Sequence, residues 1–216
     1  MNKRYTIVVF ILGVISCLGM FFLDQGFCIY GFLQSFFAGF VFWFMVVFFP
    51  EYRHKKAVYR FMVNRYKEFR INLIRIFLKA AEVFEYNKEE ELLDHENFKK
   101  FFGTKRDFRS ADLLCVAESE MDCNPAYLND IRVAFKHFSD EIDFAITKLV
   151  SDDVQLFEEL NFLKRRMYNL FNLSCYKGDP SKYIGQFFWD TLGWWSEMHG
   201  DRPNDWIADS IEKLKR

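Results

Sequence analysis

The chain has 216 residues, a length that leaves room for one modest domain with accessory segments. Its averages are those of a soluble protein, with a formal net charge of -1, 27% charged residues and 51% hydrophobic residues. The distribution of charge excludes that interpretation for the beginning of the chain, because only Lys3, Arg4 and Asp24 are charged before Pro50.

Two apolar runs, residues 5–23 and 28–49, precede Pro50 and are joined by the short sequence DQGF. A helix of about 20 apolar residues crosses the ~30 Å hydrocarbon core of a bilayer, so each run is long enough to span it. The short connection leaves room only for a tight turn. The sequence therefore predicts a two-helix transmembrane hairpin over residues 1–50.

The alternative for the first run is a cleaved signal peptide, because MNKR is a short basic start and residues 15–19 are rich in small side chains. A second apolar run follows at once, where a signal peptide would lead into a mature domain, and this favours a retained helix. Cytoplasmic flanks carry an excess of Lys and Arg, and these residues lie before the first run and after the second, with none between. Both termini are therefore predicted to be cytoplasmic.

Small residues in the second run predict a surface for helix packing or assembly. Gly31, Ser35 and Gly39 are spaced four apart and share one helix face, and Gly13 is a counterpart in the first run. Small side chains let helix backbones approach closely in lipid. The face either packs the two helices of one hairpin together or joins several chains. Gln34 is the only strongly polar side chain inside either run, which is typical of an interhelical hydrogen bond or a wet path.

Residues 51–86 are predicted to form a basic amphipathic stalk helix, because apolar residues recur at steps of three and four. Residues 51–79 hold nine basic and two acidic residues, a net charge of +7. This face suits anionic lipid headgroups, or alternatively a nucleic acid or an acidic partner. The acidic residues of 82–96 could pair with it, within the chain or between chains. The docking residues expected on the helix are Arg60, Arg65, Lys67, Arg70 and Arg75.

Residues 87–216 are predicted to form a cytosolic all-helical domain. Its clearest element is an antiparallel helix pair at about 125–150 and 153–175, where apolar residues follow a heptad and then a helical spacing. In residues 97–110, phenylalanines alternate with Lys and Arg; this pattern suits a core-forming segment, or alternatively contact with nucleic acid. Trp194 and Trp195 are candidates for an aromatic binding surface if they are exposed.

The sequence carries no recognisable catalytic motif. It has no glycine-rich phosphate loop, no GxSxG and no HExxH, and its histidines and cysteines lack metal-ligand spacing. We therefore expect no catalytic residues, no metal, no cofactor and no small-molecule substrate, and the protein is predicted not to be an enzyme. The predicted fold class is all-α: a two-helix transmembrane hairpin, a long stalk helix and a cytosolic helical bundle.

In this arrangement, with apolar runs at residues 5–23 and 28–49 ahead of a helical cytosolic part, the chain resembles the small two-transmembrane effectors of bacterial anti-phage defence systems, such as the membrane effector of retrons. The resemblance implies an antiviral defence toxin of the bacterial inner membrane. A cytosolic partner, such as a reverse transcriptase with nucleic acid or another protein, would restrain it. Once released, it would assemble as a homo-oligomer in the lipid bilayer, damage the membrane and cause abortive infection.

The alternative to this effector is a non-lethal membrane-anchored scaffold that tethers a helical interaction domain. It has the same topology and predicts no membrane damage. A simple holin-like pore is a third interpretation, but it would leave the long cytosolic part without a role.

Overall fold

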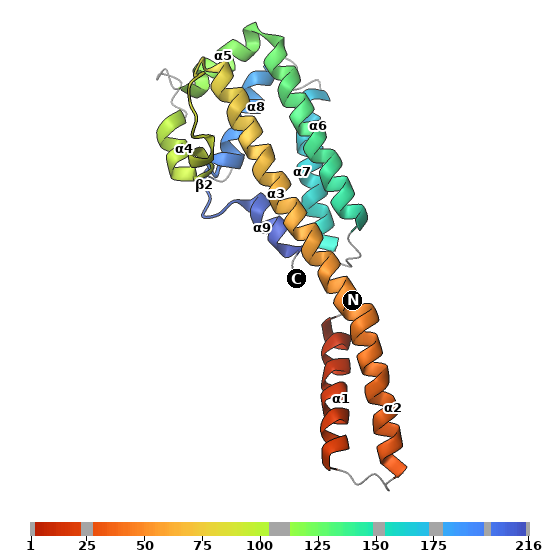
Figure 1. Ribbon diagram of the computed structural model, residues 1–216. Helices are drawn as coiled ribbons and strands as arrows, with labels where there is room; N and C mark the ends of the chain where they lie inside the picture. The colour runs from red at the N-terminus through yellow and green to blue at the C-terminus, as the bar shows by residue number, and fades with distance from the viewer. Residues whose placement is uncertain are drawn as a thin grey trace. The chain divides into compact units, whose positions relative to one another are not determined.

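The computed structural model describes residues 3–22, 28–103, 113–148, 154–172, 179–196 and 200–214. Almost all of these residues are helical, which confirms the all-α class (Figure 1). The chain divides into two compact units: unit 1 is centred on Met1–Ala57, and unit 2 contains Val58–Leu149 and Asp153–Arg216.

Unit 1 contains α1 (Lys3–Phe22), α2 (Cys28–Trp43), the π-helix η1 (Phe44–Phe48) and the first turns of α3 (Phe49–Ala80). Figure 1 shows α1 beside α2. The connection DQGF lies outside the described residues.

The π-helix η1 is explained by Pro50. A proline inside a helix has no N–H to donate, and its ring clashes with the carbonyl four residues earlier, here that of Val46. A widened turn relieves this clash, and the N–H of Phe49 donates to the carbonyl of Phe44, five residues back. The helix therefore continues through Pro50, where the sequence changes from apolar to charged.

Unit 2 is built from α3 and the elements that follow it. These are η2 (Glu89–Leu93), α4 (His95–Phe102), α5 (Leu113–Cys123), α6 (Pro125–Lys148), α7 (Val154–Asn172), α8 (Pro180–Leu192), β1 (Trp195–Ser196), β2 (Gly200–Asp201) and α9 (Trp206–Lys213). The two short strands pair antiparallel, with Trp195 opposite Asp201. The carboxylate of Asp205 caps α9 by accepting hydrogen bonds from the backbone N–H groups of Ile207 and Ala208.

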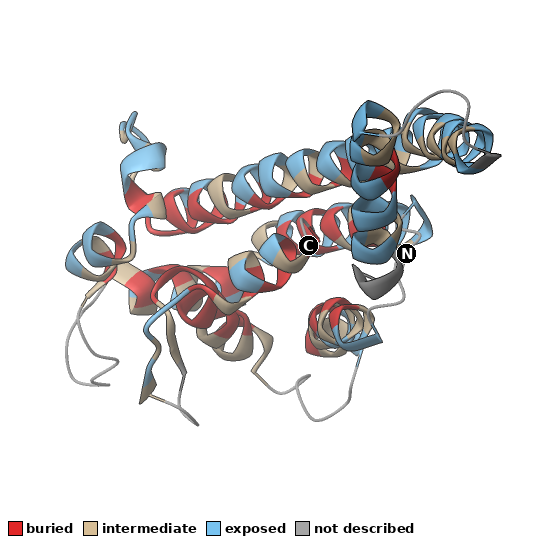
Figure 2. Cartoon of the chain, turned by 90° about the horizontal axis from the view of Figure 1, so that it is seen from below, coloured by how far each residue is buried: buried red, intermediate tan, exposed pale blue. Residues whose placement is uncertain are grey.

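The part of α3 that belongs to unit 2 is a core helix, which corrects the expectation of a stalk over residues 51–86. From Val58 to Ala80 one face of α3 is buried, because an amphipathic helix is stable when its apolar stripe is covered. Figure 2 shows the buried residues on the inward sides of the helices. The rings of Phe77 and Phe188 stack with their centroids 3.7 Å apart, joining α3 to α8 at the centre of unit 2.

The helix also ends earlier than expected. Glu82 adopts a left-handed φ of 59°, its N–H donates to Lys79 and the N–H of Val83 donates to Leu78. This is the Schellman arrangement, which is usually made by glycine. Here Glu82 takes the position that glycine usually occupies, so the sequence did not indicate that the helix ends at Ala80.

The helices α6 and α7 form an antiparallel pair close to the expected ranges. Phe135 of α6 meets Phe171 of α7 with ring centroids 5.7 Å apart, and Asp143 of α6 pairs with Lys164 of α7. A later residue of α6 thus contacts an earlier residue of α7, as expected for antiparallel helices. The expected ends at 149–150, 153 and 173–175 lie outside the described residues. Residues 104–110 of the predicted basic segment 97–110 also lie outside the described residues. The earlier part of that segment belongs to α4, with Phe98 and Phe102 in the core.

Candidate functional site

The helices α1 and α2 of unit 1 approach each other closely. A Cβ atom added to Gly13 would lie 2.5 Å from the ring of Phe40, and one added to Gly19 would lie 2.9 Å from Leu33. The ring of Phe10 meets that of Phe40 edge on, with centroids 5.8 Å apart. Contact positions rise along α1 as they fall along α2, so the helices are antiparallel. Gly13, expected to take part in helix packing, makes room for Phe40.

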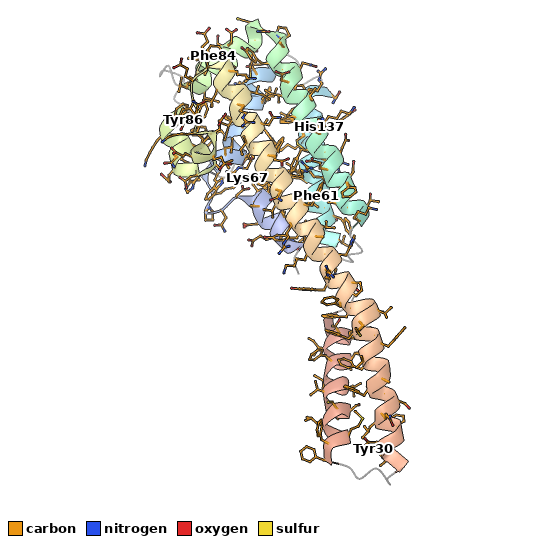
Figure 3. All side chains as sticks on the ribbon, in the orientation of Figure 1. Tyr30, Phe61, Lys67, Phe84, Tyr86 and His137 are labelled. Atoms are coloured by element: carbon orange, nitrogen blue, oxygen red, sulfur yellow. The ribbon has the colours of Figure 1, made fainter. Side chains whose placement is uncertain are left out.

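The outer surface of unit 1 is apolar. Ile29–Ala80 is one continuous helix with an apolar stretch that has the length and composition to cross a membrane, and none of that stretch is buried; Thr6–Phe22 is a shorter apolar helix. Soluble monomers rarely expose contiguous apolar patches larger than a few hundred Å². Figure 3 shows side chains projecting outward along both helices, and the exposed ones include Ile7, Phe10, Phe21, Phe32, Phe42 and Met45.

The small residues of α2 lie away from α1. No atom of the described chain lies within 4 Å of a Cβ added to Gly31 or Gly39, and Ser35 is exposed, with its hydroxyl donating to the carbonyl of Gly31 at 3.0 Å. Phe40, which contacts α1, comes nine residues after Gly31, about two and a half turns, and so lies on the opposite side of α2. The interpretation that this face packs the hairpin is therefore wrong, because bulky residues of α2 meet the glycines of α1 instead. Gln34 is also exposed.

Acidic residues of η2 cover part of the basic face of α3. Lys67, labelled in Figure 3, lies 3.0 Å from Glu90, and Arg75 lies 3.1 Å from Glu89. A hydrogen bond from its own backbone N–H and one from Arg75 lower the pKa of the Glu89 carboxyl. The pairing expected between the basic and acidic segments is thus formed within one chain.

Arg65 and Arg70 are engaged as well. Arg65 lies 2.5 Å from Glu68 and 3.3 Å from Glu141 of α6, while Arg70 reaches the buried carboxylate of Asp205. Of the five basic residues expected to form a docking face, Arg60 alone has no ion pair with the part of the chain that the structure describes, and it is exposed. The docking face predicted over all five residues is therefore limited to the beginning of α3. Carboxylates of the same chain neutralise the other four basic residues.

A buried polar cluster joins α3 to the start of α9. The Tyr66 hydroxyl donates to the Asp205 carboxylate at 2.8 Å, and Arg70 donates to the same group at 3.3 Å and to the carbonyl of Leu93. Burial raises the pKa of Asp205, although Arg70 and the hydrogen bonds oppose this effect. Burial and the nearby Asp205 charge raise the pKa of Tyr66 well above its ordinary value.

A second buried carboxylate, Asp190 of α8, lies between two arginines. Arg166 of α7 pairs with one of its oxygens, and Arg202 lies 3.0 Å from the other. The Asp190 side chain is 1% exposed, whereas the arginines are partly exposed. These two clusters tie α3, α7, α8 and the segment before α9 together, and their residues are too far apart in sequence for spacing to have revealed them.

The two tryptophans expected as a binding surface are packed into unit 2. Trp194 stacks on His95 with ring centroids 3.9 Å apart and adopts a φ of 52°, and Trp195 packs against the core. Both are only partly exposed. Trp194 and Trp195 were expected to form a binding surface only if they were exposed, and the structure does not meet that condition.

Side chains that could bind a metal ion do not gather in the described residues. No group of three or more His, Cys, Asp or Glu side chains there could hold a metal ion. An open pocket is lined by Tyr86, Glu91, Leu92, Asn97, Lys100 and Phe101. The most distinctive feature is thus the apolar surface of unit 1, and we take this surface as the candidate functional site.

Comparison of the chain with family models, curated proteins and solved structures gives no match. The function proposed below therefore depends on the residues, their geometry and the resemblance in architecture described above.

Proposed function

We propose that this protein is an inner-membrane effector (toxin) of a bacterial anti-phage defence system. A cytosolic partner restrains it, and its release disrupts membrane integrity and causes abortive infection. In this proposal α1 and α2 form a transmembrane hairpin with both chain termini in the cytoplasm. The observation that carries the proposal is the apolar surface of unit 1, which surrounds two closely packed helices and remains uncovered.

The proposal requires several copies in the membrane, because two helices cannot enclose a path across it. Gly31, Ser35 and Gly39 form an open face on α2, opposite the side that contacts α1. Small residues allow a helix of a second copy to approach closely. Gln34 is exposed near this face, and its amide would find a partner in an assembly more readily than in lipid. We therefore assign assembly to this face and cohesion of the hairpin to Gly13.

The restraining partner, a reverse transcriptase with nucleic acid or another cytosolic protein, would not use the whole basic face of α3. Lys67 and Arg75 are neutralised by η2, and Arg70 is partly buried against Asp205. The beginning of α3, with Arg60, keeps its positive charge available. Lipid headgroups and a partner would therefore compete for the same short segment.

The second candidate is a non-lethal membrane-anchored scaffold. It is favoured by the neutralisation of α3, because ion pairs within the chain leave less of the basic face for a restraining partner. It shares the anchor and the topology but predicts an intact membrane potential.

Induction of the chain alone in a bacterial host tests the proposal, with membrane potential followed by a voltage-sensitive dye alongside viable counts. The effector predicts rapid depolarisation and loss of viability, both reduced by the double substitution Gly31→Leu and Gly39→Leu. Val41→Leu is the matched control, because it enlarges another exposed side chain of α2 that is not part of the small-residue face. All variants are first shown to reach the membrane in equal amounts. Normal growth and potential with the unaltered chain would favour the scaffold.

A further inference from the structure

Two charged residues of α7 have no partner within unit 2. The other charged side chains of this helix pair with neighbouring elements: Glu159 with Lys213 of α9, Lys164 with Asp143 of α6, and Arg166 with Asp190 of α8. Glu158 and Arg165 make no ion pair with the part of the chain that the structure describes, and both are exposed. These two opposite charges are therefore available to a partner.

The same side of α7 exposes large apolar side chains. Val154 is 67% exposed, Phe162 is 59% exposed and Tyr168 is 66% exposed. Phe162 touches Trp206 of α9, with ring centroids 6.0 Å apart, but this contact leaves more than half of the Phe162 side chain uncovered. On a helix with 3.6 residues per turn, these three positions and the two unpaired charges lie within about one third of the circumference. We call these five residues the α7 face.

The α7 face is complementary to itself when two copies run antiparallel. Glu158 precedes Phe162 by four residues and Arg165 follows it by three, while Val154 and Tyr168 lie further out on the two sides. An antiparallel second copy that pairs Glu158 with Arg165 also places Phe162 beside Phe162. Val154 then lies beside Tyr168 of the second copy, and each match is level to within about 1.5 Å, the rise of one residue. Twofold symmetry makes the charge contact twice.

The two charges favour a second copy over a polyanionic partner. A nucleic acid or an anionic lipid surface would attract Arg165, but it would place its own negative charge against Glu158 two turns away. A second copy satisfies both charges at once. Aromatic rings and arginine are also enriched in the interfaces between proteins, and the α7 face provides both.

We propose that the α7 faces of two copies pair antiparallel and form a twofold interface between their second units. Phe162 lies near the twofold axis, flanked on each side by a Glu158–Arg165 ion pair and then by Val154 against Tyr168. This contact does not require the proposed membrane function, because all of its residues belong to unit 2. It gives the chain a self-association surface separate from the small-residue face of α2.

The test is disulfide cross-linking of the full chain in detergent, with its five native cysteines replaced by serine. A single cysteine is introduced by Asn161→Cys, because Asn161 is next to Phe162, is partly exposed and would lie near the twofold axis. Val133→Cys is the control, since Val133 is 48% exposed on α6. The fraction of cross-linked dimer after mild oxidation is measured on non-reducing gels over a dilution series. We expect the dimer with Asn161→Cys and little of it with Val133→Cys.

Charge reversal then tests the pairing itself in the Asn161→Cys chain. Glu158→Arg or Arg165→Glu replaces two attractive contacts with two repulsive ones, and each should weaken dimer formation by about tenfold. The double variant Glu158→Arg with Arg165→Glu remakes both contacts with the charges exchanged, and it should restore the dimer. Lys136→Glu is the matched control for Arg165→Glu, because it makes the same change of charge at an exposed position of α6 and should leave cross-linking unaltered.

Three results would overturn the interface: equal cross-linking with Asn161→Cys and Val133→Cys, no loss in the single charge reversals, or no recovery in the double variant. Thermal unfolding of each variant confirms that unit 2 is intact. Cross-linking in detergent reports on the contact between second units whether or not induction of the chain collapses the membrane potential. Failure of this interface is therefore distinguishable from failure of the proposed effector.

Discussion

Units 1 and 2 use similar side chains in opposite ways. In unit 2, rings such as Phe77 and Phe188 are buried and charged residues form the surface, whereas in unit 1 rings such as Phe32 and Phe42 are exposed along helices that carry almost no charge. Aromatic content therefore says little about which side of a helix is covered. The position of the charges indicates which solvent each unit suits, and the two patterns meet near Pro50.

The largest effect is expected from Phe77→Ala. Phe77 is fully buried and stacks on Phe188, and removing a buried Phe side chain costs about 3–5 kcal/mol. Phe42→Ala should leave the unfolding of unit 2 unchanged, because Phe42 is exposed in unit 1. Urea unfolding of both variants in lipid nanodiscs, followed by tryptophan fluorescence, measures the difference. A similar loss of unfolding free energy in both variants would contradict the distinction between the units.

The second effect concerns buried charge, a feature of the interior of unit 2. Asp190→Asn removes the carboxylate that Arg166 and Arg202 share, and breaking a buried ion pair costs about 3–5 kcal/mol. We expect the lower end of this range because both arginines are partly exposed. Asp201→Asn is the control, since Asp201 pairs with Lys99 at the surface and such pairs contribute about 0–1 kcal/mol. Equal stability of the two variants by urea unfolding would contradict a structural role for Asp190.

The sequence predicted the elements better than their contacts. The helical period within residues 51–86 predicted an amphipathic helix, and the structure contains one as far as Ala80, because periodicity reports which face is covered. It did not reveal what covers that face, so a core helix was interpreted as a stalk. The Arg70–Asp205 pair joins residues 135 positions apart, and no local pattern encodes such a contact. Similarly, Gly31 and Gly39 were predicted either to pack the hairpin or to join several chains. The packing of Phe40 on Gly13 depends on the rotation of two helices, which neither run encodes alone.

A smaller effect is expected from the titration of Asp205. Burial raises its pKa in the folded protein above the ordinary value of about 3.9. A carboxyl group of this kind adds stability below the unfolded pKa and loses that contribution as the pH rises through the folded pKa. The unfolding free energy of the unaltered chain minus that of Asp205→Asn should therefore decrease as the pH rises from about 4. A difference that stays constant or increases would contradict the cause assigned to the shift.

The smallest effect is expected at the charged surface of α3. Arg75→Gln removes the ion pair with Glu89, and exposed pairs contribute about 0–1 kcal/mol. Its effect on urea unfolding should fade further at high salt, because exposed charges are screened. A loss as large as that of Asp190→Asn would show that η2 is held mainly by its charges rather than by the buried Leu92.

The proposed effector function depends most directly on unit 1 lying within a lipid bilayer. Alkaline carbonate extraction of host membranes containing the full chain separates integral proteins from those attached by charge. The chain should stay in the membrane pellet, because lipid would surround the exposed apolar surface of α1 and α2 if the proposed anchor is correct. Release of the chain into the supernatant would contradict the membrane anchor and, with it, the proposed effector.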